Sequence, residues 1–193
     1  MIVRVAGMRL TLPTLLTLFR ILLIPVMVFV FYAPFKGANI AASAVFIAAA
    51  ITDWLDGWVA RKYGLHSAFG EFLDPVADKL MVAVTLFLIV QENPTVPLAI
   101  MSAVIVGREI SISALREWMA ELGERARVRV ANVGKIKTIA QLISIVVLLY
   151  QKDLDGVGLF HVGEVLLGVA AALTIWSGYV YLRAAWPVLR TER

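Results

Sequence analysis

The sequence predicts an all-α polytopic membrane protein with six transmembrane helices and a short N-terminal amphipathic segment. Three observations lead to this fold class. The chain has 193 residues, of which 61% are hydrophobic, whereas soluble domains are about 45–50% apolar. Its mean hydropathy is +0.85. Apolar stretches of spanning length recur along the chain, and clusters of glycine, proline and charged residues separate them.

The six predicted spans follow from these apolar stretches, because a spanning helix needs roughly 20 residues. They cover residues 14–33, 38–60, 72–91, 95–120, 135–151 and 160–187. Breaks fall near Gly37, Gly64, Pro94 and Gly156. A sheet is excluded at membrane depth, since the spans are too long and lack alternation. No linker or internal repeat is found, so residues 1–193 are expected to form a single transmembrane domain.

Lysine and arginine are distributed unevenly between the two predicted sides of the membrane. Of the 18 basic residues, only Lys36 and Lys152 fall in the loops of one side. The positive-inside rule therefore predicts that the other side, with both termini, is cytoplasmic. The first ten residues are interpreted either as the amphipathic segment, lying on the membrane surface, or as a frayed terminus.

Cysteine is absent and histidine occurs twice. The absence of cysteine excludes disulfides, thiolate metal sites and cysteine nucleophiles. Two histidines argue against a histidine-rich metal site. Any metal chemistry is therefore expected to use oxygen ligands.

Four aspartates lie where two apolar helices meet. Asp53 and Asp56 end the second span, and Asp74 and Asp78 begin the third. A charged side chain in or near lipid is costly unless it is paired, solvated or bound to metal. Helical spacings of three and four residues place each pair on one face of its helix, together with small residues and one arginine. These companions are Gly57, Ala60, Arg61 and Gly70.

The short loop at about 61–69 makes these helices antiparallel neighbours, so their two faces can bring four carboxylates around one point. Like charges at close range repel strongly unless cations neutralise them. Hard oxygen ligands suit Mg²⁺ or Mn²⁺, and four carboxylates can hold two ions, the arrangement used for phosphoryl displacement. The small residues leave room for a ligand, and Arg61 could bind a diphosphate bidentately. A solvated helix end explains one aspartate, but not the whole pattern.

The pattern D-x2-D-G-x2-A-R-x8-G-x3-D-x3-D, from Asp53 to Asp78, resembles the signature of the CDP-alcohol phosphotransferase family. All eight fixed positions are present. The resemblance covers essentially the whole chain and implies a homodimer of six-helix subunits in the bacterial inner membrane. It also implies two divalent cations, Mg or Mn, held by the acidic residues Asp53, Asp56, Asp74 and Asp78.

The resemblance further implies roles for single residues. Asp78 would be the general base that takes a proton from the acceptor hydroxyl. The acceptor oxygen would attack the β-phosphorus of a CDP-lipid, and CMP would leave. The CDP-lipid would contact residues of the motif and of the first span, namely Thr17, Asp56, Gly57, Ala60, Arg61 and Gly70.

A second group of basic residues concerns the acceptor. It consists of Arg108, Arg116, Lys135 and Lys137. These residues lie on predicted helices that should border the aspartates, so they suggest a pocket for an acceptor with its own phosphate. The alternative interpretation is ordinary positive-inside charge and contact with lipid headgroups. We favour substrate binding.

Motifs around these cations, R-E-I…L-R and G-K-x-K-T…Q, are similar to the bacterial phosphatidylglycerophosphate synthase subfamily. So is PTLLTLFR, in which Thr17 and Arg20 match, although many members carry Asn where this chain has Thr11 or Thr14. The implied reaction of phospholipid biosynthesis transfers the phosphatidyl group of CDP-diacylglycerol to sn-glycerol 3-phosphate. The expected partners are these substrates, membrane lipid and a second copy of the chain, and no nucleic acid.

Two alternatives stay open. The same chemistry could act on inositol phosphate, serine or phosphatidylglycerol; a serine acceptor would not need the extra cations, whereas inositol phosphate would. A cation transporter could use the aspartates as ion ligands. Against a transporter are the small size, the lack of inverted repeats and the position of all four aspartates at the cytoplasmic end.

Overall fold

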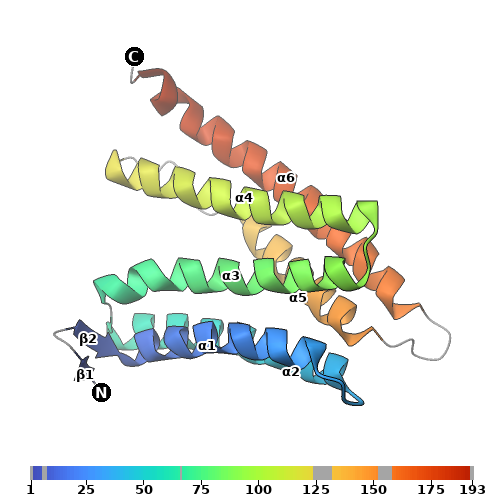
Figure 1. Ribbon diagram of the computed structural model, residues 1–193. Helices are drawn as coiled ribbons and strands as arrows, with labels where there is room; N and C mark the ends of the chain where they lie inside the picture. The colour runs from blue at the N-terminus through green and yellow to red at the C-terminus, as the bar shows by residue number, and fades with distance from the viewer. Residues whose placement is uncertain (1, 6–7, 66, 124–131, 152–157, 192–193) are drawn as a thin grey trace. The chain divides into compact units, whose positions relative to one another are not determined.

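Six α-helices dominate the part of the chain that the structure describes, and the sequence predicts helices in these places. The computed structural model describes residues 2–5, 8–65, 67–123, 132–151 and 158–191. The helices are α1 (Leu12–Tyr32), α2 (Ala38–Tyr63), α3 (Ala68–Glu92), α4 (Val96–Glu121), α5 (Asn132–Tyr150) and α6 (Leu159–Thr191) (Figure 1). Each corresponds to one predicted span. The helical fold of a multi-pass membrane protein is therefore confirmed.

Four of the helices, α1, α2, α4 and α6, are long and apolar enough to cross a membrane, judged by length and composition in the described residues. The apolar part of α5, Ile136–Tyr150, is shorter. Helix α3 has 25 residues, but its first half carries the charged part of the aspartate motif. The number of six membrane crossings therefore stays a prediction.

The N-terminal segment forms a small antiparallel hairpin of β1 (Ile2–Val5) and β2 (Met8–Thr11). Apolar and polar residues alternate in β2, and such alternation suits a two-stranded ribbon. Strand β2 runs directly into α1. Thr11 ends the strand and caps the helix, because its side chain accepts a hydrogen bond from the Thr14 backbone N–H. Asn is also a preferred residue at helix N-caps, for the same reason.

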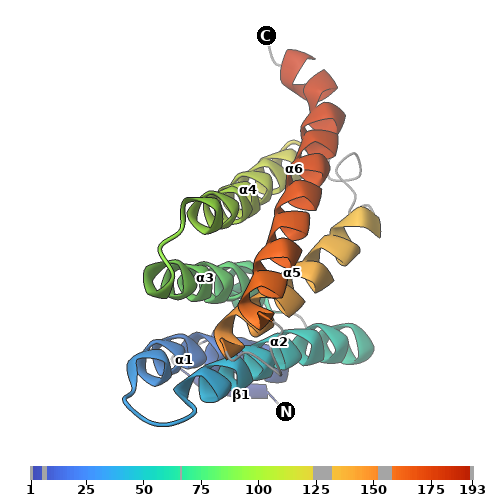
Figure 2. The same ribbon diagram turned by 90° about the vertical axis from the view of Figure 1, so that its right-hand side faces the viewer.

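The helices fall into two compact units, which are described separately. The first comprises Met1–Gln91 and Leu149–Lys152. Here α1 and α2 lie side by side (Figures 1 and 2). Small buried residues of α2, Ala42 and Ala49, allow this close packing. Gly64 ends α2 in a left-handed conformation with φ of 62°, and α3 begins at Ala68.

The second unit comprises Glu92–Leu148 and Asp153–Arg193. Helices α4 and α6 pack together, with a buried cluster of Ile112, Met119, Tyr181 and Ala185. Helix α6 also approaches α5 closely. A methyl group added at Gly163 would lie 2.8 Å from Leu148 Cγ, so this glycine is required for the contact.

Candidate active site

The four aspartates lie on adjacent ends of α2 and α3, as predicted, but their environments differ. Asp56 is buried, with 4% of its surface exposed. Asp53, one turn earlier on α2, is half-exposed. Asp74 on α3 is partly buried, and Asp78, one turn further along, is exposed. Asp53 and Asp78 are therefore the more exposed residues of the four.

Arg20 of α1 joins the two aspartates of α2. Its Nη1 lies 2.6 Å from Asp53 Oδ1, and its Nη2 donates to Asp56 Oδ2. The arginine is only 1% exposed. An unpaired charge at such a position would be strongly destabilising, so the two carboxylates are what allows it to be buried. Sequence reasoning assigned no role to Arg20, although an arginine within an apolar span was a usable signal.

Thr17, one turn before Arg20, contacts the aspartate of the neighbouring helix α3. Its hydroxyl has two acceptors, the Asp74 carboxylate and the Pro13 carbonyl oxygen at 3.1 Å. A carboxylate is the stronger acceptor of the two, because hydrogen bonds to charged groups are the stronger ones. The sequence-based role of Thr17 was contact with the CDP-lipid, whereas the contact found here is with Asp74.

Gly70 lies close to α1 at the start of α3. A Cβ atom built on it would lie 2.9 Å from Thr14 Oγ1 and 3.0 Å from Ser67 Oγ. These two hydroxyls also contact each other at 2.9 Å. The small residue expected to make room for nucleotide therefore also makes room for the packing of α3 on α1.

Gly70→Ala is expected to lower the free energy of unfolding by about 1–3 kcal/mol, because the added methyl group overpacks this contact. The fall should appear as a lower thermal midpoint in detergent. Gly107→Ala is the matched control: a Cβ there meets nothing within 4 Å. Alanine also suits the interior of α4 better than glycine, so the control should be neutral or slightly stabilising. Equal stability of Gly70→Ala and wild type would refute the close packing.

Arg61, at the last turn of α2, is exposed and folds back over Gly57. A Cβ at Gly57 would lie 3.2 Å from Arg61 Nη1. Gly57 therefore leaves space for the guanidinium beside the helix, one turn from the aspartates. Ala60, also on this turn, is partly exposed. Binding of an anionic ligand by Arg61, Gly57 and Ala60 stays a prediction.

The donor set fits a hard divalent cation in kind, since it consists of carboxylate oxygens without sulfur or imidazole. The fit in position is partial. Asp53 and Asp56 converge on one point, which the Arg20 guanidinium shares, and Asp74 meets the same face of α1 through Thr17. Within the described ranges, no three acidic or imidazole side chains come close enough to hold one ion. Coordination by all four aspartates thus stays a prediction.

The second unit gathers part of the predicted acceptor site. Glu109 of α4 accepts a hydrogen bond from Lys137 of α5, and Arg108 Nη1 lies 3.6 Å from the same Glu109 oxygen. Lys137 is only 3% exposed. Arg108 also donates to Ser177 Oγ at 2.9 Å. The structure therefore brings together two of the four predicted cations around Glu109, which the sequence suggested could orient an arginine or a hydroxyl.

The other two predicted cations are not part of this group. Arg116 lies exposed on α4, about two turns beyond Glu109. Lys135 belongs to the first turn of α5, and its side chain lies outside the described part of the structure.

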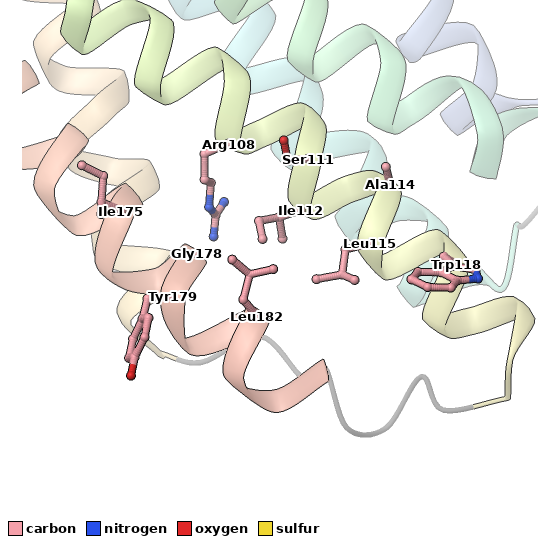
Figure 3. A pocket seen from close by; sticks show the side chains of 10 residues that line it. All are labelled: Arg108, Ser111, Ile112, Ala114, Leu115, Trp118, Ile175, Gly178, Tyr179 and Leu182. Carbon is pink, nitrogen blue, oxygen red and sulfur yellow. The ribbon is translucent and has the colours of Figure 1, made fainter. Parts of the chain in front are cut away.

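An apolar groove of about 720 Å³ runs along α4 and α6 in the second unit. Figure 3 shows Arg108 pointing from α4 toward Gly178 of α6, with Leu115 and Leu182 further along. The Arg108 guanidinium carbon lies 5.6 Å from the centre of the Tyr181 ring. Arg108 thus stands at the edge of a surface suited to hydrocarbon.

Comparisons with known proteins agree with the motif. The profile of the family described as CDP-alcohol phosphatidyltransferase matches residues 10–176. Three bacterial relatives carry the name CDP-diacylglycerol–glycerol-3-phosphate 3-phosphatidyltransferase. The protein of Sodalis glossinidius is 47% identical over 92% of this chain and 96% of its own length. That of Pseudomonas fluorescens is 50% identical over 93% and 92%, and that of Yersinia pestis 50% over 93% and 97%.

Proposed function

Because the chain belongs to the CDP-alcohol phosphatidyltransferase family, we propose that it transfers the phosphatidyl group of CDP-diacylglycerol to sn-glycerol 3-phosphate. The products are phosphatidylglycerophosphate and CMP. The names of relatives that match over nine-tenths of the chain support this choice of substrates. The observation that carries the proposal is the meeting of Asp53 and Asp56 of α2 with Asp74 of α3 against one face of α1.

The family is known to use divalent metal. We assign two cations, Mg²⁺ or Mn²⁺, to the four aspartates Asp53, Asp56, Asp74 and Asp78. When bound, they would supply the positive charge that stabilises the diphosphate and the departing phosphate. Arg61, Gly57 and Ala60 accommodate the nucleotide diphosphate at the end of α2. Thr17 of α1 and Gly70 at the start of α3 belong to the same CDP-lipid site.

Asp78 is the residue that accepts the proton. The acceptor hydroxyl loses its proton to the Asp78 carboxylate while its oxygen forms a bond to the β-phosphorus, which carries the lipid. The bond from that phosphorus to the bridging oxygen breaks, and CMP leaves with the electron pair. Asp78 suits this role because it is exposed, whereas Asp56 is buried against Arg20.

The acceptor phosphate is bound by cations of the second unit. Lys137 and Arg108, which both form ion pairs with Glu109, supply positive charge. Arg116 and Lys135 complete the predicted set. An anion with its own phosphate suits this group, whereas serine does not need it. The family match runs across both units, which supports treating residues 1–193 as one functional domain.

The proposed setting is the bacterial inner membrane, with the aspartates and both termini on the cytoplasmic side and with two subunits per enzyme. The distribution of basic residues supports this orientation. Membrane lipid surrounds the helices, and the CDP-lipid reaches the site by diffusing within the membrane. A cation transporter is not favoured, since the family membership is that of a transferase.

CMP release by the purified full-length protein tests the proposal. Each reaction contains CDP-diacylglycerol, Mg²⁺ or Mn²⁺, and one acceptor. The acceptors are sn-glycerol 3-phosphate, inositol 1-phosphate, serine and phosphatidylglycerol. Release is expected with sn-glycerol 3-phosphate, at a rate at least about tenfold above that with serine, which has no phosphate, since a charge-assisted phosphate contact is worth about 1.5–3 kcal/mol. Inositol 1-phosphate also carries a phosphate, so its exclusion is expected from the names of the relatives and not from this contact. Release with another acceptor alone would overturn the acceptor assignment, and release with none would overturn the activity.

A further inference from the structure

Four polar side chains recur at every third position from the N-cap of α1 into its first turns. They are Thr11, Thr14, Thr17 and Arg20. All are buried, with exposures of 4%, 1%, 0% and 1%. Residues three apart are neighbours on a helix surface, so these side chains form one continuous polar stripe on an otherwise apolar helix. Burying so many polar groups is costly unless each one has a partner.

The partners of the stripe lie on the two helices that carry the aspartates. Thr11 contacts Thr14 at 2.9 Å, and Thr14 contacts Ser67 just before α3. Further along, Thr17 donates to Asp74 and Arg20 to Asp56. One face of α1 therefore contacts three of the four aspartates of the motif.

The Arg20 contacts restrict how the α2 aspartates can be oriented. Two carboxylates one turn apart on the same helix face repel each other and, without a partner, would turn apart. The guanidinium uses one oxygen of each, Asp53 Oδ1 and Asp56 Oδ2. The contact with Asp56 is a hydrogen bond, whereas the contact with Asp53 is an ion pair. Because the fork of donors is rigid and permanently charged, it directs Asp56 and draws Asp53 toward the same point.

We propose that Arg20 and Thr17 are positioning residues, which hold Asp53, Asp56 and Asp74 in the orientation in which these carboxylates bind divalent cations. This inference rests on the proposed function, because it takes the aspartates to be metal ligands. Neither residue touches the reacting atoms. Their contribution is made through the aspartates, as is typical of groups that orient metal ligands.

Mn²⁺ binding tests the inference without using activity as the readout. The full-length protein in detergent is titrated with Mn²⁺ in the absence of CDP-lipid, and unbound Mn²⁺ is measured from its electron paramagnetic resonance signal. Arg20→Met should bind Mn²⁺ about 10–100-fold more weakly than wild type, the usual cost of losing such a partner. Arg20→Lys should fall between the two, since it keeps the charge but loses the fork.

Arg183→Met is the matched control. It makes the same substitution at an exposed arginine of α6, so it removes one positive charge without touching an aspartate. Its Mn²⁺ affinity should equal that of wild type. An unchanged or higher affinity in Arg20→Met would overturn the inference, because removal of a nearby like charge would then be the dominant effect.

Thr17→Val provides a second test should Arg20→Met not fold. Valine keeps the shape of threonine and removes only the hydroxyl that contacts Asp74. Because no CDP-lipid is present, a direct contact of Thr17 with lipid cannot contribute, and weaker Mn²⁺ binding is expected. Normal binding in Thr17→Val and Arg20→Lys would refute the positioning role.

Wild type distinguishes failure of this inference from failure of the proposed function. A wild-type protein that binds Mn²⁺ and releases CMP upholds the proposed function, and the variants then test Arg20 and Thr17 alone. A wild-type protein that neither binds Mn²⁺ nor releases CMP overturns both.

Discussion

Asp78→Asn is expected to abolish CMP release, with turnover falling by about 10²–10⁴-fold, the usual contribution of a general base. Asparagine has nearly the same shape as aspartate but cannot accept the proton of the acceptor hydroxyl. Asp78 is exposed on α3, so its replacement should leave the fold intact. Turnover is measured as CMP release with saturating CDP-diacylglycerol, sn-glycerol 3-phosphate and Mg²⁺.

Binding must be measured alongside turnover, because Asp78 is also a proposed metal ligand. Metal-dependent binding of CDP-diacylglycerol to Asp78→Asn should remain largely intact, since the other three aspartates keep their contacts with α1. Glu92→Gln makes the same carboxylate-to-amide change at the far end of α3, where it is exposed, and should retain wild-type turnover. If Asp78→Asn retains near-normal turnover, the assignment of the base to Asp78 is wrong.

Most of the helical fold was predictable because long apolar runs end at residues with special backbone requirements. The predicted span 38–60 corresponds to Ala38–Tyr63, which begins after Gly37 and ends at Gly64, both with positive φ. The N-terminal hairpin was not predicted as a pair of strands. Four-residue strands give little periodicity, so neither strand can be recognised before its pairing, such as that of Ile2 with Thr11, is known.

The site was predictable only where one helix face carries the information. Asp53 with Asp56, and Asp74 with Asp78, follow from spacing alone. Their bond to Arg20 does not, because the sequence reveals a buried charge but not which acidic residue on another helix neutralises it. The same holds for Glu109, whose two cations come from α4 and α5. Sequence spacing grouped Arg108 with Arg116, whereas the structure groups it with Lys137.

Lys137→Met is expected to raise the KM for sn-glycerol 3-phosphate by about tenfold to a hundredfold, the equivalent of about 1.5–3 kcal/mol for a charge-assisted contact. Methionine keeps the length of the side chain, which limits repacking at this buried position. The KM for CDP-diacylglycerol should stay within about twofold of wild type, since the aspartate motif carries that contact. Steady-state CMP release with each substrate varied in turn measures both constants.

Arg116→Met distinguishes the grouping of Arg108 with Arg116, which the sequence spacing suggests, from the grouping of Arg108 with Lys137, which the structure shows. Arg116 is exposed, so its substitution should raise the KM for sn-glycerol 3-phosphate less than Lys137→Met does, because exposed charge contacts are worth only about 0–1 kcal/mol. Equal effects of both substitutions would mean that Arg116 of α4 contributes as much to the acceptor phosphate as Lys137 of α5, as the sequence-based set of four cations predicts. An effect of neither on this KM would remove the cations of the second unit from the acceptor site, and the positive-inside interpretation of these residues would then stand.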